Sequence, residues 1–172
     1  MDPSITIRPF VGSDAGQVRD LFIAVNRRLA PPGMAAAFEA YIARSLGEEI
    51  DDVEGYYAGK RGGFWVAVAG AEVVGMFGLE RVSDEAMELR RMYVDPAMRR
   101  RGIARWMLQF AEDECRRRRY LRLDLSTSQI QEEALAFYRA AGYRLLREEV
   151  AEAASNKTLG GGIRRYHFTK SL

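Results

Sequence analysis

The segment over residues 92–105 constrains the fold more than any other part of the sequence. Its apolar beginning, residues 92–94, ends at Asp95-Pro96, and a strand must stop there because proline cannot donate a hydrogen bond to a neighbouring strand. A basic loop follows, then Gly102 and a helix-forming pattern. A strand, a basic turn, a glycine and a helix together point backbone N–H groups and the positive end of the helix dipole at an anion. The segment therefore predicts an anion-binding site.

Other phosphate-binding loops fit this segment poorly. It lacks the Gly-Lys-Ser/Thr ending of a P-loop and the Gly-x-Gly-x-x-Gly pattern of a dinucleotide-binding turn. The plain alternative is a capped turn with solvated arginines. The following helix ends in a second basic run, residues 116–119, where cations oppose the negative pole of the helix dipole. That run predicts a solvated helix end, since no aromatic residues accompany it for stacking on bases.

The composition bounds the class of protein. A length of 172 residues with 48% apolar and 29% charged residues predicts one globular domain over residues 1–172. The formal net charge of +2 gives no general electrostatic reason to expect nucleic acid as a partner. The lone Cys115 cannot form an internal disulfide, which fits a reducing compartment. Without a basic leader or an apolar run of membrane-spanning length, we expect a cytoplasmic protein with no membrane partner.

Periodicity and turn residues predict strands alternating with helices. The predicted strands cover residues 5–10, 64–69, 72–79, 86–94, 120–125, 143–149 and 163–169. Four helices are predicted. The first follows a cap at residues 13–14, and the other three cover residues 35–46, 102–118 and 131–141. Gly75 and Gly78 inside a strand predict a bulge or a close approach by another group. Residues 47–63 predict a loop or short helix, and residues 151–162 predict a mobile segment.

The anion-site segment resembles a known family. Its Arg99-x-x-Gly102-x-Ala104 is similar to the Arg/Gln-x-x-Gly-x-Gly/Ala acyl-CoA signature of the GCN5-related N-acetyltransferases. In that family the loop binds the pyrophosphate of coenzyme A. The segment also follows a predicted strand, over residues 86–94, as the family's loop does.

A second motif strengthens the resemblance. The family carries Asn-x-x-Ala-x-x-x-Tyr-x-x-x-Gly-Phe, and this chain has Ala134, Tyr138, Gly142 and Tyr143 in the same register. Gln131 replaces the usual asparagine. Glutamine keeps the amide on a longer arm, so a hydrogen bond from Gln131 to the pantetheine is still expected.

The resemblance implies an α/β (α+β) fold, with a central mixed, mostly antiparallel sheet of six to seven strands flanked by about four helices. The fourth and fifth strands would splay apart, and the pantetheine of acetyl-CoA would pair with the fourth strand as an added strand does. The implied cofactor-binding residues are Met92, Tyr93, Val94, Arg99, Arg100, Arg101, Gly102, Ile103, Ala104, Arg105 and Gln131. The implied activity is acetyl-CoA-dependent N-acetyl transfer, without a metal, directly to a primary amine of a small molecule or peptide through a ternary complex. A homodimer would also fit the family.

Tyr138 and Glu88 are the candidate catalytic residues. The resemblance places the Tyr138 hydroxyl near the coenzyme sulfur, as general acid for the leaving thiolate; the alternative is a core tyrosine on an apolar helix face. Glu88 lies eleven residues before Arg99, which matches the general-base glutamate of histone-type members. The alternative for Glu88 is a structural ion pair with Arg90, because a charge in a central strand needs a partner. A backbone N–H of the same strand is the candidate oxyanion donor.

Two residue types narrow the chemistry further. His167 is the only histidine, which excludes a histidine-based triad and a multi-histidine metal site. Cys115 lies on the apolar stripe of its helix and is expected in the core, not as a nucleophile. Covalent catalysis is therefore disfavoured.

The acceptor is less constrained. Five acidic residues predict a cationic amine, because an acidic rim attracts cations, unless they are only a solvated surface. They are Glu48, Glu49, Asp51, Asp52 and Glu54. Two rival functions stay open. One is a non-catalytic acyl-CoA-binding sensor or protein-interaction module of the same fold. The other is a nucleic-acid binder using residues 99–119, which predicts salt-sensitive DNA retention.

Overall fold

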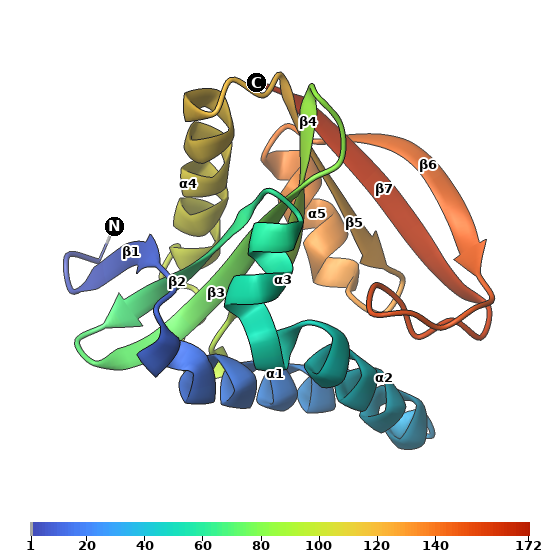
Figure 1. Cartoon of the computed structure of the whole chain (residues 1–172). Coiled ribbons are helices and arrows are strands. Elements are labelled where there is room, and N and C mark those ends of the chain that lie inside the picture. Colours follow the sequence, from blue (N-terminus) through green and yellow to red (C-terminus); the bar gives the residue numbers. More distant parts are fainter. Residues whose placement is uncertain (1) are drawn as a thin grey trace.

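The chain forms a seven-stranded sheet in the computed structural model, which describes residues 2–172 (Figure 1). The strands are β1 (Ile5–Pro9), β2 (Gly63–Ala69), β3 (Glu72–Arg81), β4 (Ala86–Val94), β5 (Arg122–Ser128), β6 (Arg144–Ala151) and β7 (Ile163–Ser171). They lie in the order β1-β2-β3-β4-β5-β7-β6, and every neighbouring pair is antiparallel except β4 and β5. The expected mixed, mostly antiparallel sheet is confirmed.

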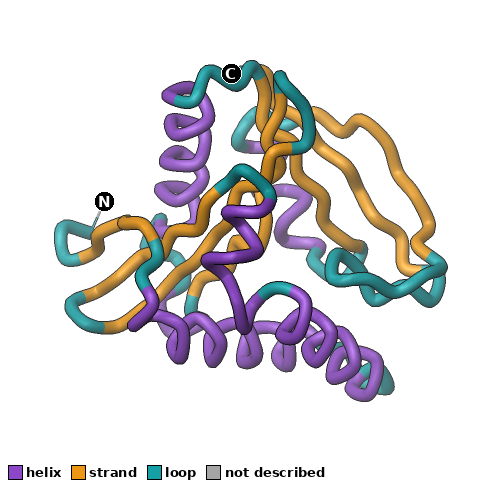
Figure 2. Tube along the Cα trace, viewed as in Figure 1, coloured by secondary structure: helices purple, strands orange, loops and turns teal. Residues whose placement is uncertain are grey.

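Helices cover both faces of this sheet (Figure 2). The α-helices are α1 (Ala15–Leu29), α2 (Ala35–Glu48), α3 (Val53–Gly59), α4 (Ile103–Arg117) and α5 (Glu132–Ala140). Three 3-10 turns, η1 (Gly12–Asp14), η2 (Ile50–Asp52) and η3 (Pro96–Met98), join them to the strands. Helices α1, α2 and α3 share one hydrophobic cluster with the sheet, and α4 and α5 share the other. Within residues 2–172, no helix combines the length and apolarity that crossing a membrane requires.

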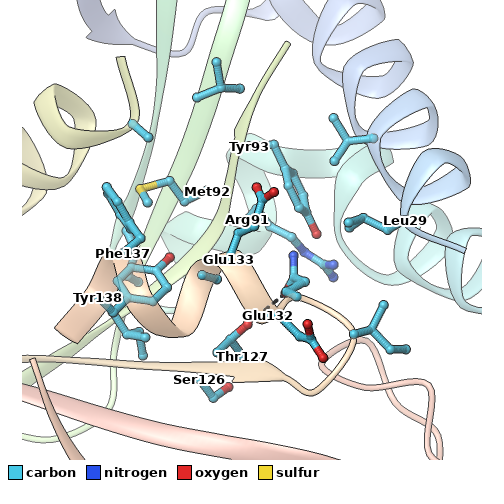
Figure 3. A pocket seen from close by; sticks show the side chains of 18 of the residues that line it. Leu29, Arg91, Met92, Tyr93, Ser126, Thr127, Glu132, Glu133, Phe137 and Tyr138 are labelled. Carbon is cyan, nitrogen blue, oxygen red and sulfur yellow. Dashed lines mark hydrogen bonds between the residues drawn. The ribbon is translucent and has the colours of Figure 1, made fainter. Parts of the chain in front are cut away.

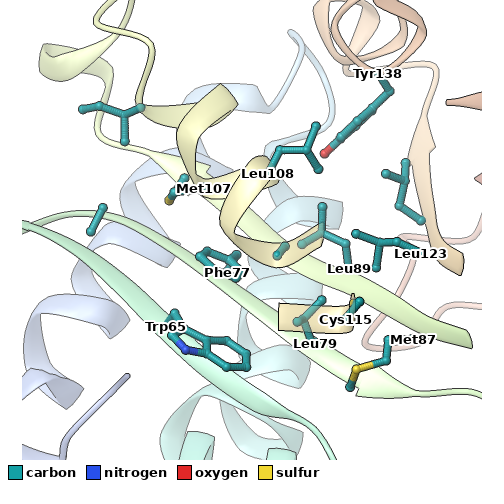
Figure 4. Packing of buried hydrophobic residues seen from close by; sticks show 14 of the residues in the cluster. Trp65, Phe77, Leu79, Met87, Leu89, Met107, Leu108, Cys115, Leu123 and Tyr138 are labelled. Carbon is teal, nitrogen blue, oxygen red and sulfur yellow. The ribbon is translucent and has the colours of Figure 1, made fainter. Parts of the chain in front are cut away.

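Strand β2 shows why both faces need a cover. Phe64 and Val66 belong to the cluster with α1, whereas Trp65 and Ala67 belong to the cluster with α4. Successive side chains of a strand point to opposite faces, so a continuous apolar run is buried on both sides. Figure 4 shows the α4 cluster, in which Cys115 is fully buried. Burial raises the pKa of the Cys115 thiol to about 12, as suits a core residue.

Strands β4 and β5 pair only at their beginnings. Residues 86–89 of β4 run parallel to residues 122–125 of β5, and the two strands then diverge. One edge of β4 over residues 90–94 therefore has no strand beside it, which leaves backbone hydrogen-bonding groups open. The expected splay of the fourth and fifth strands is confirmed.

A bulge distorts β4 at the point where the two strands separate. Between the pairs Gly78–Arg90 and Met76–Tyr93, β4 contains one residue more than β3. Arg91 lies in this stretch and has a left-handed backbone, with φ of 55°. A bulge of this kind bends the strand and re-aims its side chains. The irregularity that the glycines of β3 predict is a second bulge, in β3 itself, where Val74 is the extra residue between the pairs Ala67–Gly75 and Val68–Val73.

The segments with the weakest sequence signals are both ordered. Residues 47–63 form η2 and α3, the short-helix alternative. Tyr57 of α3 is buried over Gly78, where a Cβ atom would lie 2.5 Å from the tyrosine ring. Residues 152–162, expected to be mobile, instead reach back from the end of β6 and place Asn156 and Lys157 against buried charges.

Candidate active site

A cavity of about 1260 Å³ opens where β4 and β5 separate (Figure 3). Its walls come from α1, β4, the loop before α4, the end of β5, α5 and β7. In Figure 3, Phe137 and Tyr138 of α5 lie on one side, and Arg91 and Tyr93 of β4 lie on the other. The cavity therefore joins the α4–α5 side of the sheet to the α1–α2 side.

The predicted anion site forms one end of this cavity. Arg99, Arg100, Gly102, Ile103, Ala104 and Arg105 all line it. Gly102 has a left-handed φ of 77°, and a Cβ atom there would meet nothing within 4 Å. The space beside the start of α4 is thus free for a ligand, and a side chain would be strained there. The helix N-terminus supplies backbone N–H groups on the same side.

The arginines of the basic loop divide into two groups. No carboxylate lies within 4.0 Å of Arg99, Arg100 or Arg105 in the described chain. Arg101 does not line the cavity, and its Nη1 lies 3.4 Å from Asp2 Oδ2. The three free cations suit phosphate groups, whereas Arg101 ties the loop to the N-terminal segment.

The open edge of β4 forms the middle of the cavity wall. Met92, Tyr93 and Val94 line it, as the resemblance leads one to expect. Gln131 also lines it, and Gln131 Oε1 accepts a hydrogen bond of 3.0 Å from the Thr127 hydroxyl. This bond orients the glutamine and leaves its amide N–H groups for another partner.

Tyr138 combines a core ring with a hydroxyl that faces the cavity. Its ring packs near Tyr143 and Phe168, with centroid separations of 5.8 Å and 6.4 Å. Among residues 2–172 its hydroxyl has no hydrogen-bond partner, although the residue is only 8% exposed. Burial raises the pKa of Tyr138, so the hydroxyl keeps its proton across the neutral range. The alternative of a core tyrosine therefore holds for the ring of Tyr138, while its hydroxyl stays available as a proton donor.

Glu88 has a different partner from the one that the sequence suggests. It lies directly opposite Glu80 of β3, and two carboxylates in that position repel each other. Lys157 Nζ compensates both, at 2.8 Å from Glu80 Oε1 and 3.3 Å from Glu88 Oε1. Burial opposes the charge on Lys157, but Glu88 and Glu80 outweigh it and raise the pKa of the lysine. The alternative ion pair between Glu88 and Arg90 is not formed, because Arg90 reaches Glu80 and Glu49 instead.

Arg90 and Arg91 point into a buried cluster of charges. Arg91 forms a bidentate pair with Glu49, in which Nε donates to Oε2 at 2.8 Å and Nη2 donates to Oε1 at 3.1 Å. Arg90 donates to Glu49 at 3.1 Å and to Glu80 at 3.0 Å. The Tyr57 hydroxyl donates to Glu49 at 2.9 Å. This cluster ties the bulge of β4 to the end of α2 and to α3.

The β6–β7 loop covers the same cluster. The Asn156 carbonyl accepts from Arg91 Nη2 at 2.6 Å, and the Asn156 amide donates to Glu49 at 3.3 Å. Sequence reasoning missed this arrangement. The available signal was two adjacent arginines in a predicted central strand, each of which needs a carboxylate when it is buried.

The acidic stretch near the end of α2 does not border the cavity. Of its five carboxylates only Glu49 is buried, and the other four are exposed. None of the five lines the cavity. The structure therefore removes the basis for expecting a cationic acceptor.

The comparisons with known proteins agree with this geometry. Residues 60–145, which are half of the chain, match the acetyltransferase (GNAT) domain. The chain belongs to the GNAT acetyltransferase family. It is 35% identical to human N-acetyltransferase 8 over 114 residues, covering 60% of this chain and 48% of that protein. It is 32% identical to N-acetylaspartate synthetase from Danio rerio over 111 residues, covering 63% of this chain and 39% of that protein. The chain spans about half the length of the curated relatives it matches.

Solved GNAT structures share the fold over almost the whole chain. A GNAT acetyltransferase from Staphylococcus aureus Mu50 superposes with a TM-score of 0.77 at 20% identity, covering 98% of this chain and 99% of the other. A GNAT acetyltransferase from Elizabethkingia anophelis, solved with acetyl-CoA bound, superposes with a TM-score of 0.65 at 16% identity, covering 99% and 100%. At these identities the likeness concerns the fold.

Proposed function

We propose that this GNAT protein is an acetyl-CoA-dependent N-acetyltransferase. It would move the acetyl group directly to a primary amine of a small molecule or peptide in a ternary complex. The observation that carries the proposal is the continuity of one cavity from the basic loop, past the open edge of β4, to Tyr138 and Glu88. One cavity could thus hold the phosphates, the pantetheine arm and the reacting groups.

The residues along the cavity fit acetyl-CoA. Arg99, Arg100 and Arg105 would neutralise phosphates together with the N-terminus of α4. The open edge of β4 would pair with the amides of the pantetheine, as a peptide strand does. Gln131 would donate a further hydrogen bond to the same arm. In this order the thioester would lie at the inner end, beside Tyr138.

The chemistry needs one base and one acid. Glu88 would take a proton from the acceptor ammonium, directly or through a water, so that the nitrogen can attack the thioester carbon. A backbone N–H at the bulge of β4 would stabilise the negative charge that develops on the carbonyl oxygen. As the C–N bond forms and the C–S bond breaks, Tyr138 would give its proton to the leaving thiolate. The acceptor nitrogen loses two protons in all. Glu88 passes the first to solvent, and the second, lost from the nitrogen of the tetrahedral intermediate, replaces the proton that Tyr138 gives to the thiolate.

The rival function is a non-catalytic acyl-CoA-binding module. A sensor needs the basic loop, but it needs neither a free Tyr138 hydroxyl nor a carboxylate at Glu88. Thiol release from acetyl-CoA across a panel of amines separates the two. Binding of acetyl-CoA with no thiol release for any amine would favour the module.

Acetyl-CoA is expected to raise the melting temperature. A ligand at one hundred times its dissociation constant adds about 2.7 kcal/mol when it binds only the native state. For a domain of this size that corresponds to roughly 5–10 °C, measurable by differential scanning fluorimetry. Gly102→Val should abolish the shift, because it fills the open space beside the phosphate loop.

The matched control for Gly102→Val is Gly70→Val. Gly70 lies in the turn between β2 and β3, also has a left-handed φ, of 62°, and also has open space around it. Both variants carry the same backbone strain, but only Gly102 lines the cavity. An unchanged acetyl-CoA shift in Gly102→Val, or no shift in the unmodified protein, would contradict the cofactor assignment.

Glu88→Gln is expected to lower kcat roughly 10²- to 10⁴-fold, mainly on the acidic limb of the pH–rate profile. The reason is that glutamine keeps the shape of the side chain but cannot accept the proton of the amine. Lys157 keeps its contact with Glu80, so the melting temperature should change little. The measurements are the kcat profile and the melting temperature on one preparation.

Glu85→Gln is the control for Glu88→Gln, since Glu85 lies just before β4 with 64% of its side chain exposed. It should leave both readouts unchanged. If Glu88→Gln instead lowers the melting temperature and keeps the shape of the profile, then Glu88 only holds Lys157 in place.

A further inference from the structure

Arg165 of β7 has no carboxylate partner in the part of the chain that the structure describes. Its Nη2 donates to Ser126 Oγ at 2.7 Å, and this is its one side-chain contact of hydrogen-bond length within residues 2–172. No carboxylate of the described chain lies within 4.0 Å of its guanidinium, in contrast to Arg90 and Arg91. The side chain is partly buried, and it lines the cavity.

Arg165 lies away from the phosphate loop. Its Cα atom pairs with that of Ser128 at the end of β5. The charged and phenolic groups that influence its pKa most are Tyr41, Glu88, Glu149 and Arg90. Burial lowers the pKa of Arg165, which is the mark of a charge that these groups do not fully compensate. The guanidinium is therefore on the side of Glu88, where an acceptor would bind.

A partly buried cation whose one partner is a hydroxyl is stabilised when an anion joins it. The guanidinium is a rigid fork, and Ser126 uses one of its N–H groups. The remaining N–H groups suit the two oxygens of a carboxylate. Arg28 of α1 lines the same cavity, is exposed, and also has no carboxylate within 4.0 Å among the described residues. Both arginines therefore offer N–H groups to an anion, in a cavity that Glu88, Glu132 and Glu133 also line.

We propose that Arg165 binds a carboxylate of the acceptor, so that the substrate is a small amino acid-like molecule with an amine directed to Glu88 and a carboxylate directed to Arg165. This inference rests on the proposed N-acetyltransferase function and narrows its acceptor. It replaces the expectation of a cationic amine, because the acidic residues behind that expectation lie outside the cavity.

The test compares acceptors that differ only in the carboxylate. Suitable pairs are L-phenylalanine with 2-phenylethylamine, L-leucine with 3-methylbutylamine, and L-lysine with 1,5-diaminopentane. We expect kcat/KM, followed by thiol release, to be roughly 10- to 100-fold higher for the carboxylated member of at least one pair, the range of one charge-assisted hydrogen-bonded contact. Equal or faster turnover of the decarboxylated amines would overturn the inference while leaving the proposed function intact.

Arg165→Met should raise KM for the preferred amino acid roughly 10- to 100-fold and leave its decarboxylated partner unchanged. Arg165→Lys should recover part of the loss, because lysine keeps the charge without the fork. Arg164→Met is the control, since Arg164 is the preceding residue of β7 and pairs with Glu148 at 2.9 Å outside the cavity. It should leave KM unchanged for both acceptors.

Two outcomes would count against Arg165 as the carboxylate site. One is an equal loss of activity toward both members of a pair in Arg165→Met and Arg165→Lys. The other is an unchanged preference for the carboxylate in both variants. Absence of turnover with every amine, together with absence of an acetyl-CoA melting shift, would instead be a failure of the proposed function.

Discussion

Tyr138→Phe is expected to lower kcat roughly 10²- to 10⁴-fold while acetyl-CoA affinity and stability stay almost unchanged. The substitution removes only a hydroxyl, and that hydroxyl has no partner among residues 2–172. The ring stays in the core, so no cavity forms. Because burial raises the pKa of Tyr138, the hydroxyl also holds its proton at alkaline pH. Tyrosine ionisation should therefore not cause a loss of kcat below its ordinary pKa of about 10.

Tyr143→Phe makes the same chemical change in the same core cluster and is the control. The Tyr143 hydroxyl donates to the buried Glu112 at 3.2 Å and does not line the cavity. Loss of a hydrogen bond to a charged group costs about 1.5–3 kcal/mol, so Tyr143→Phe should lower the melting temperature and keep kcat. The opposite pattern is expected for Tyr138→Phe. A Tyr138→Phe enzyme that turns over at the full rate would remove its assignment as the acid.

Much of the fold could be predicted because its signals are local. The stop at Pro96, Gly102 and the helical period after it lie within one stretch of chain, and each acts on its neighbours in sequence. Gly78 likewise predicted an irregularity in β3. The splay of β4 and β5 is different, since no residue pattern encodes it, and it was expected only from the resemblance to the family.

The polar contacts of the site could not be predicted in the same way. Glu49 meets Arg90 and Arg91 across more than forty residues, and Lys157 meets Glu88 across 69. Such pairs depend on the bulge and on the path of a loop, and neither is visible in composition. The small, polar β6–β7 loop predicted mobility because its anchors are the main-chain carbonyl and side-chain amide of Asn156 and one lysine, which carry no pattern in the sequence. The position of Arg165 in the cavity likewise follows from the topology of β7.

The same contacts suggest how the site is kept in shape. The open edge of β4 must stay irregular to leave room for a ligand, yet it must not shift. The two arginines at the bulge give up hydration to bind one carboxylate, Glu49, from another part of the chain. The β6–β7 loop then bonds to the same three residues through Asn156. We infer that the buried ion cluster holds β4, α2 and this loop in one arrangement.

Glu49→Gln should therefore destabilise the protein strongly. The Glu49 side chain has no solvent exposure and accepts hydrogen bonds from Arg90, Arg91, Tyr57 and Asn156. Removing one partner of a buried ion pair leaves an uncompensated charge, which costs about 3–5 kcal/mol. The amide of glutamine would also turn N–H donors toward groups that are donors themselves. For a domain of this size we expect the melting temperature to fall by roughly 6–20 °C.

Glu48→Gln supplies the matched control, because Glu48 is the neighbouring residue of α2 and is exposed. A surface substitution of this kind stays within about 0.5 kcal/mol, so its melting temperature should match that of the unmodified protein. Thermal unfolding monitored by circular dichroism compares the two variants directly. If the two variants have the same melting temperature, then other groups compensate the charge of the β4 arginines, and the ion cluster does not hold the bulge. If it melts early while still binding acetyl-CoA below its transition, then the cluster serves stability and the phosphate loop is independent of it.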